Sequence, residues 1–139
     1  MEIKNIKALE TVMFHTNNIK KEKQIAALCR SLKLGVRTIK QQDINKQLGG
    51  ICMQGGSKGG SVLSKRERTK APDKYILPEL IIFSGLSDET VDRFLEEYKR
   101  SGIEPVALKA VVTPTNISWS IYELVCELEK ERMQYEKPF

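Results

Sequence analysis

The chain has 139 residues, of which 40% are hydrophobic and 29% charged, enough for one domain with a modest core. No apolar run approaches the roughly 18 residues of a membrane span, and the charged start "MEIKNIKALE" is unlike a signal peptide. We therefore expect a cytoplasmic protein. Its cysteines, Cys29, Cys52 and Cys126, form no CxxC pair, which argues against a disulfide framework or a structural zinc site.

The net charge of +5 is distributed unevenly along the chain. Residues 1–75 hold 16 Lys and Arg against six Asp and Glu, whereas residues 76–139 hold seven against 12. One interpretation is that the first half binds nucleic acid or an acidic partner; the other is that the two halves attract each other. The second is favoured, because a basic segment without interleaved aromatic residues is a weak nucleic-acid signal.

The first half, about residues 10–50, predicts a strand, a helix and a second strand. The run "TVMFHT" is rich in β-branched and aromatic residues, which favour a strand, and "VRTIKQQ" predicts another. Between them, "KKEKQIAALCRSLKLG" has helical apolar spacing, at Ile25, Leu28, Cys29 and Leu32. We expect Gly35 to take the left-handed conformation that ends this helix.

A Gly-rich basic segment follows, over about residues 53–74, and predicts a mobile loop or linker. Its "GGSKGGS" lacks the spacing of a phosphate-binding loop. Its densest basic run could hold the phosphates of a nucleic acid through Lys65, Arg66, Arg68 and Lys70, although such runs are more often merely solvated.

The second half, about residues 76–135, repeats the pattern of the first. The segments "ELIIFSG" and "VALKAVVT" predict strands on either side of a helix with apolar residues at Val91, Phe94, Leu95 and Tyr98. Gly102 is expected to end that helix in a left-handed conformation. A further helix is predicted from the spacing of Ile121, Leu124, Val125 and Leu128.

This order of elements predicts one α/β domain over residues 1–139, built from two related βαβ halves. A helix between two strands normally makes them parallel, so we expect a mostly parallel four-stranded sheet flanked by helices. The alternative is a ferredoxin-like α+β fold with an extra C-terminal helix, in which the halves meet antiparallel.

The segments "ELIIFSGLSDETVDRFLEEYKRSGI" and "VALKAVVTPTNISWSIYELVCELEKER" carry a resemblance to a known family. Residues 79–132 resemble small bacterial proteins that share a domain of unknown function, in which a Leu-Lys-Ala-Val-Leu-Thr-Pro-Thr-Asn run precedes a Trp and a Glu-Leu helix. Here Val112 stands where the family has Leu. The resemblance covers about two fifths of the chain and implies a cytosolic bacterial α/β domain without an established activity.

Polar residues follow the predicted strands and suggest where a ligand could bind. If all strands run parallel, their carboxyl ends form one polar rim, where open α/β sheets bind ligands. We expect its ligand contacts to be His15, Asn17, Ser84, Thr113, Thr115 and Asn116. The competing interpretation of the last three is structural, since Pro114 ends a strand and Ser120 with Glu123 fits a helix capping box.

The sequence offers no catalytic constellation. The rim lacks paired carboxylates, His15 has no evident orienting partner, and neither a metal site nor a cofactor is indicated. We expect a non-catalytic module that binds a small ligand or a protein. Two alternatives stay open: nucleic-acid binding through the basic first half and loop, and an enzyme acting on a small anionic substrate at the strand carboxyl edge. The oligomeric state cannot be inferred.

Overall fold

The computed structural model describes residues 10–52 and 70–136, and the chain divides into two compact units. The first unit comprises Met1–Ile39 and Glu79–Val111, and the second comprises Lys40–Pro78 and Val112–Phe139. Most of the Gly-rich segment, residues 53–69, lies outside the described residues.

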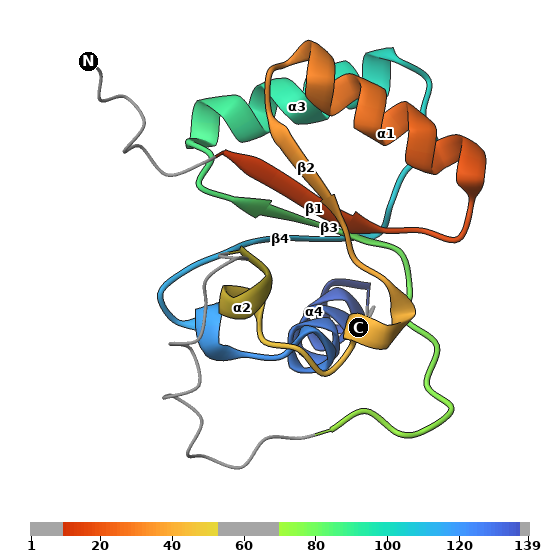
Figure 1. Cartoon of the computed structure of the whole chain (residues 1–139), viewed down its shortest axis with the longest axis vertical. Coiled ribbons are helices and arrows are strands. Elements are labelled where there is room, and N and C mark those ends of the chain that lie inside the picture. Colours follow the sequence, from red (N-terminus) through yellow and green to blue (C-terminus); the bar gives the residue numbers. More distant parts are fainter. Residues whose placement is uncertain (1–9, 53–69, 137–139) are drawn as a thin grey trace. The chain divides into compact units, whose positions relative to one another are not determined.

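The first unit contains a four-stranded sheet in the order β2-β1-β3-β4 (Figure 1). The strands are β1 (Thr11–His15), β2 (Gly35–Thr38), β3 (Leu80–Ser84) and β4 (Leu108–Val111). β1 pairs with β2 in parallel and β3 with β4 in parallel, whereas β1 and β3 pair antiparallel. The predicted α/β fold with a mostly parallel sheet is confirmed. The halves nevertheless meet antiparallel, an arrangement that the sequence analysis associated with the ferredoxin-like alternative.

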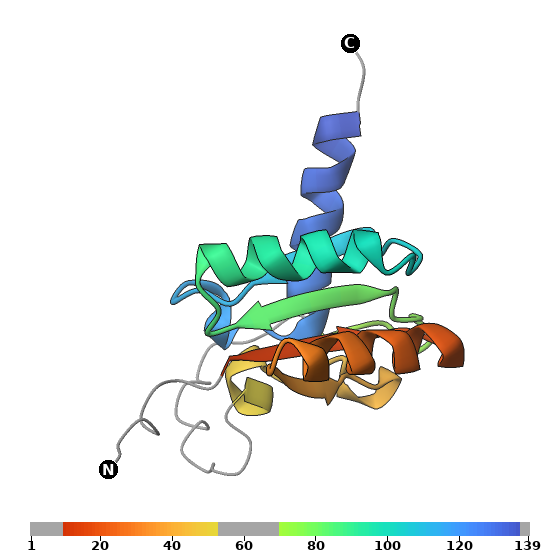
Figure 2. The ribbon, with the colours of Figure 1, turned by 90° about the horizontal axis from the view of Figure 1, so that it is seen from above.

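Each pair of parallel strands is connected by a helix, α1 (Ile19–Ser31) or α3 (Asp88–Arg100). Both helices lie on the same face of the sheet and run antiparallel to each other (Figure 2). This follows from the topology, because two crossovers of the same hand, joined through an antiparallel central pair, place their helices on one face. The two βαβ halves are thus related by an approximate two-fold rotation.

The core between these helices and the sheet repeats this relationship residue by residue. Val12 and Phe14 of β1 correspond to Ile81 and Phe83 of β3, and the two strands face each other with Val12 opposite Phe83 and Phe14 opposite Ile81. Matched positions continue through the helices and beyond them, at Ile25 and Phe94, Cys29 and Tyr98, and Leu34 and Ile103. Burial raises the pKa of the Cys29 thiol to about 11, despite the nearby Arg30 charge, so Cys29 serves as a small apolar core residue.

The two helices also begin and end in matching ways. The side chains of Asn18 and Ser87 cap α1 and α3 by accepting the backbone N–H of the residue three positions on. After the helices, Lys33 and Gly102 occupy the left-handed position, with φ of 61° and 76°. Gly102 was predicted there, but the prediction for Gly35 is wrong: α1 ends earlier, and Gly35 starts β2, its N–H donating to the carbonyl of Glu10.

The second unit is made of short helices and one long one. Its elements are η2 (Gln41–Asp43), α2 (Leu48–Cys52), η4 (Asn116–Ser118) and α4 (Ile121–Glu136). The start of α2 is tied to the turn before α4, because the N–H of Leu48 donates to Trp119 and that of Ile121 donates to Lys46. α4 begins with the predicted capping box, in which Ser120 and Glu123 accept each other's backbone N–H.

Candidate functional site

The carboxyl end of β1 carries a cluster of bonded polar side chains, which we call the Lys21 cluster: Thr16, Asn18, Lys21 and Glu79. The antiparallel register of β1 and β3 places Thr16 opposite Glu79, just beyond the pair of His15 and Leu80. The hydroxyl of Thr16 donates to Glu79 Oε2 over 2.5 Å and accepts the N–H of Asn18. The same turn starts α1, so the cluster joins the sheet to the helix.

Lys21 is the unusual member, because a lysine in the first turn of a helix is normally solvated. Its exposed fraction is only 5%, and its Nζ lies 2.7 Å from Glu79 Oε1 and 3.3 Å from the carbonyl oxygen of Pro105. A buried ammonium requires such partners, since an unpaired charge is costly to desolvate. The sequence analysis missed Lys21, although it precedes Ile25 by one helical turn and therefore lies on the apolar stripe of α1.

The carboxyl group of Glu79 is held in its charged form. Burial alone would raise the pKa of Glu79, but the hydrogen bonds from Lys21 and Thr16, together with the charges of Lys21 and His15, outweigh that effect. The pKa of Glu79 therefore lies below its ordinary value, and the carboxylate remains the partner of Lys21 at neutral pH.

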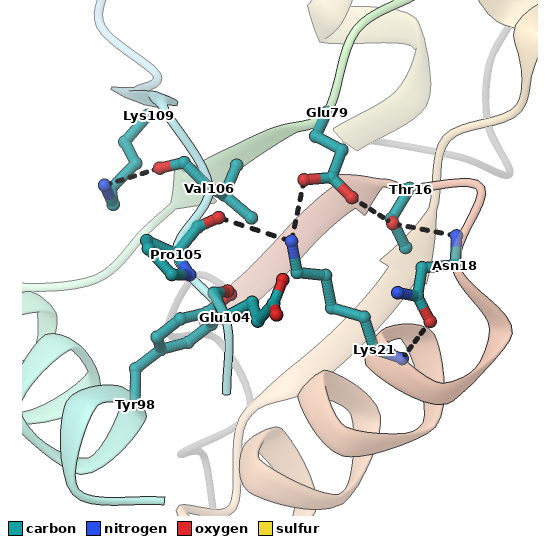
Figure 3. A network of polar contacts seen from close by, with 9 residues as sticks. All are labelled: Thr16, Asn18, Lys21, Glu79, Tyr98, Glu104, Pro105, Val106 and Lys109. Atoms are coloured by element: carbon teal, nitrogen blue, oxygen red, sulfur yellow. Dashed lines mark hydrogen bonds and ion pairs between the residues drawn. The ribbon is translucent and has the colours of Figure 1, made fainter. Parts of the chain in front are cut away.

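The segment that leads into β4 is fixed by three side chains from three different elements. Figure 3 shows Tyr98, Lys21 and Lys109 donating to the successive carbonyls of Glu104, Pro105 and Val106. Burial, with the charges of Glu79 and Glu104, raises the pKa of Tyr98 to about 12, so its hydroxyl remains a donor. The Lys21 cluster is therefore continuous with a structural support for this segment, at the place where the second half is longer than the first.

The predicted rim of ligand contacts does not form as one edge of the sheet. Because β1 and β3 are antiparallel, His15 pairs with Leu80 at one end of the strands and Ser84 pairs with Thr11 at the other. The expectation that His15 and Ser84 share an edge is wrong, since it required parallel halves. Asn17 is exposed in the turn after His15.

His15 is buried and orients its ring through the neighbouring strand. Its Nδ1 donates to the carbonyl of Ile39 over 2.7 Å, because a carbonyl can only accept. Within residues 10–52 and 70–136, Nε2 of His15 is buried and has no hydrogen-bond partner. The ring is thus fixed in place by β2, and its Nε2 is the acceptor in this tautomer.

The Thr-Pro-Thr-Asn turn lies in the second unit, where its polar groups bond one another. The Thr113 N–H donates to Asn116 Oδ1 over 2.8 Å, and the Asn116 N–H donates to the Thr113 hydroxyl over 3.1 Å. Asn116 is 9% exposed, while Thr115 is exposed. These bonds account for Thr113 and Asn116 as turn-forming residues; their role as ligand contacts stays a prediction, as does that of Thr115.

A second surface feature appears on α1 itself. Its outward side carries Lys20, Lys23 and Arg30, all exposed, which we call the α1 basic face. Their spacing of three and seven residues puts them on one side of the helix, with Ala27 among them. None of the three forms an ion pair with a described residue. The sequence analysis counted the charge of the first half but did not resolve this face, although the helical spacing was there to be used.

The comparisons with known proteins add one finding. Residues 79–135 match a domain of unknown function, DUF3783. This confirms the resemblance of the second half to such a domain. The comparisons with curated proteins and with solved structures gave no match.

The DUF3783 match divides the Lys21 cluster. It begins at Glu79 and includes Tyr98 and Lys109, whereas Lys21 and the whole α1 basic face precede it. In the described part of the chain, no helix combines the length and apolar character needed to cross a membrane. The described residues also contain no group of three or more His, Cys, Asp and Glu that could hold a metal ion. Of the predicted basic loop contacts, Lys70 is exposed, and Lys65, Arg66 and Arg68 lie outside the described residues.

Proposed function

We propose that the protein is a non-catalytic binding module and that the α1 basic face is the surface with which it binds an anionic partner. The polar groups that most resemble a reactive site, in the Lys21 cluster, are occupied by one another and by backbone carbonyls. Such pairing supports a structural role for Lys21 and Glu79. A catalytic lysine or carboxylate would instead need an approach for a substrate and a proton to exchange.

The observation that carries the proposal is the uncompensated charge of α1. Exposed cations normally find a carboxylate on a neighbouring turn, as Lys130 does with Glu127 and Lys46 with Asp43. Lys20, Lys23 and Arg30 are exposed without such a pair among the described residues. They extend over about 15 Å of helix, since an α-helix rises about 1.5 Å per residue. A surface of this kind attracts a partner whose negative charges lie along a line.

Binding to heparin, a linear polyanion, tests the proposal. A variant with Lys20→Glu, Lys23→Glu and Arg30→Glu should elute from immobilised heparin at much lower salt than the unaltered protein. The matched control carries Lys74→Glu, Lys99→Glu and Lys130→Glu, which change the net charge equally at other exposed positions. Equal losses in the two variants would mean that net charge alone governs binding, and the proposal would then fail.

A further inference from the structure

We infer that the anionic partner of the α1 basic face is the phosphate backbone of a nucleic acid, bound without regard to base sequence. The inference rests on the proposed function, because it names the partner of the same surface. It is carried by the composition of the face, its spacing and the charges of the neighbouring helix.

The composition of the face fits phosphates better than a protein surface. Protein interfaces gain their affinity from buried aromatic and apolar anchors and are depleted in lysine. The α1 basic face has two lysines and an arginine around the small Ala27, and it has no aromatic side chain. Phosphate oxygens need only such positive donors, which act as point charges without a matching pocket.

The same composition argues against reading of bases. Base recognition uses side chains that hydrogen-bond to base edges or aromatic rings on which bases stack. Asn18, the nearest amide at the start of α1, is engaged as the helix cap, because its Oδ1 accepts the N–H of Lys21. The contacts that remain are those of cations with the backbone, which position a nucleic acid but do not specify its sequence.

The neighbouring helix restricts where the strand can lie. α3 runs beside α1 on the same face of the sheet, and its outward side exposes Glu89, Asp92 and Glu96 (Figure 2). These carboxylates repel phosphates, so a bound strand follows α1 and stays away from α3. The arrangement predicts opposite effects of neutralising the two helices, which a general attraction to a basic protein would not produce.

The inference is tested by fluorescence anisotropy with a labelled dT20 strand, a labelled duplex of arbitrary sequence and labelled polyglutamate. With three phosphate contacts, affinity for dT20 should fall about 20-fold and for the duplex about 40-fold between 50 and 200 mM salt. Each of Lys20→Gln, Lys23→Gln and Arg30→Gln should reduce the slope of log K against log salt by about 0.7 for dT20 and 0.9 for the duplex.

The neutralised α3 variant, Glu89→Gln with Asp92→Asn and Glu96→Gln, should bind dT20 about threefold more tightly. Circular dichroism of every variant establishes that the fold is retained. Tighter binding of polyglutamate than of either nucleic acid would overturn the inference and leave the proposed function standing, since the partner would then be an acidic protein. Failure to bind any of the three polyanions would overturn both. A slope that responds only to Lys65→Gln, Arg66→Gln, Arg68→Gln and Lys70→Gln would also overturn both, by moving the interface to the loop.

Discussion

The Nζ of Lys21 lies 2.7 Å from Oε1 of Glu79, and this ion pair joins the first βαβ half to the second. The side chain of Lys21 is 6% exposed and that of Glu79 is 34% exposed, so the cost of separating the pair is unequal. Removing Glu79 leaves a buried cation without a countercharge, whereas removing Lys21 leaves a carboxylate that water can reach. The basic and acidic halves of the sequence thus meet in one specific contact.

Glu79→Gln should therefore destabilise the protein by about 2–3 kcal/mol, somewhat less than a fully buried pair because Glu79 reaches solvent. Lys21→Met should cost less, and the double variant Lys21→Met/Glu79→Gln should cost less than the sum of the two, since neither charge is then left alone. Urea unfolding of the four proteins measures this cycle. The exposed pair of Lys130 and Glu127 provides the control, and Glu127→Gln should change the free energy of unfolding by less than about 0.5 kcal/mol. Strict additivity in the cycle would contradict the role given to the pair.

The same contact makes stability depend on pH in a predictable direction. The pKa of Glu79 in the folded protein is below its ordinary value of 4.5, despite the opposing effect of burial, because Lys21 and Thr16 hydrogen-bond to the carboxylate. A lowered folded pKa gives stability that is fully present above pH 4.5 and is lost as pH falls through the folded pKa. The difference in free energy of unfolding between the unaltered protein and Glu79→Gln should thus shrink between pH 5 and pH 3.

Part of the acid sensitivity should survive in the Glu79→Gln variant. The pKa of Asp43 is also lowered, because hydrogen bonds from Lys46 and the Lys40 N–H outweigh the effect of burial. The Asp43 contribution should therefore persist when Glu79 is replaced. A difference between the two proteins that stays constant from pH 7 to pH 3 would show that Glu79 does not titrate with a lowered pKa.

The left-handed positions after α1 and α3 predict opposite effects of substitution at matching sites. Lys33 is exposed with φ of 61°, a conformation that costs a residue with a Cβ about 1 kcal/mol, so Lys33→Gly should raise the free energy of unfolding by up to about 1 kcal/mol. At Gly102, φ is 76° and an added Cβ would meet no atom within 4 Å. Gly102→Ala should therefore destabilise through backbone strain alone, by about 1 kcal/mol. Thermal unfolding should shift upward for the first variant and downward for the second; shifts of the same sign would refute this account.

The sequence allowed the local elements to be predicted, because helix and strand periodicity and the Ser120 capping box depend on neighbouring residues. It did not determine whether β1 and β3 run parallel, since that depends on pairing between segments separated by the Gly-rich segment. The error in placing His15 and Ser84 on one edge follows from this single choice. Lys21 was accessible in principle, as a charged residue in register with Ile25, but its partner Glu79 is known only once the strands are paired.

The start of α4 offers a test of the structural explanation for its serines. The Oγ of Ser120 accepts the N–H of Glu123 over 3.1 Å, and Ser120 is 1% exposed. Ser120→Ala leaves that N–H without its acceptor and should lower the free energy of unfolding by about 1 kcal/mol. Glu123→Gln retains an acceptor for the Ser120 N–H and should be nearly neutral. Ser118→Ala is the matched control, because Ser118 participates in the printed bonds through its carbonyl, which accepts from Gln47. Equal losses for Ser118→Ala and Ser120→Ala in urea unfolding would mean that the cap does not stabilise α4.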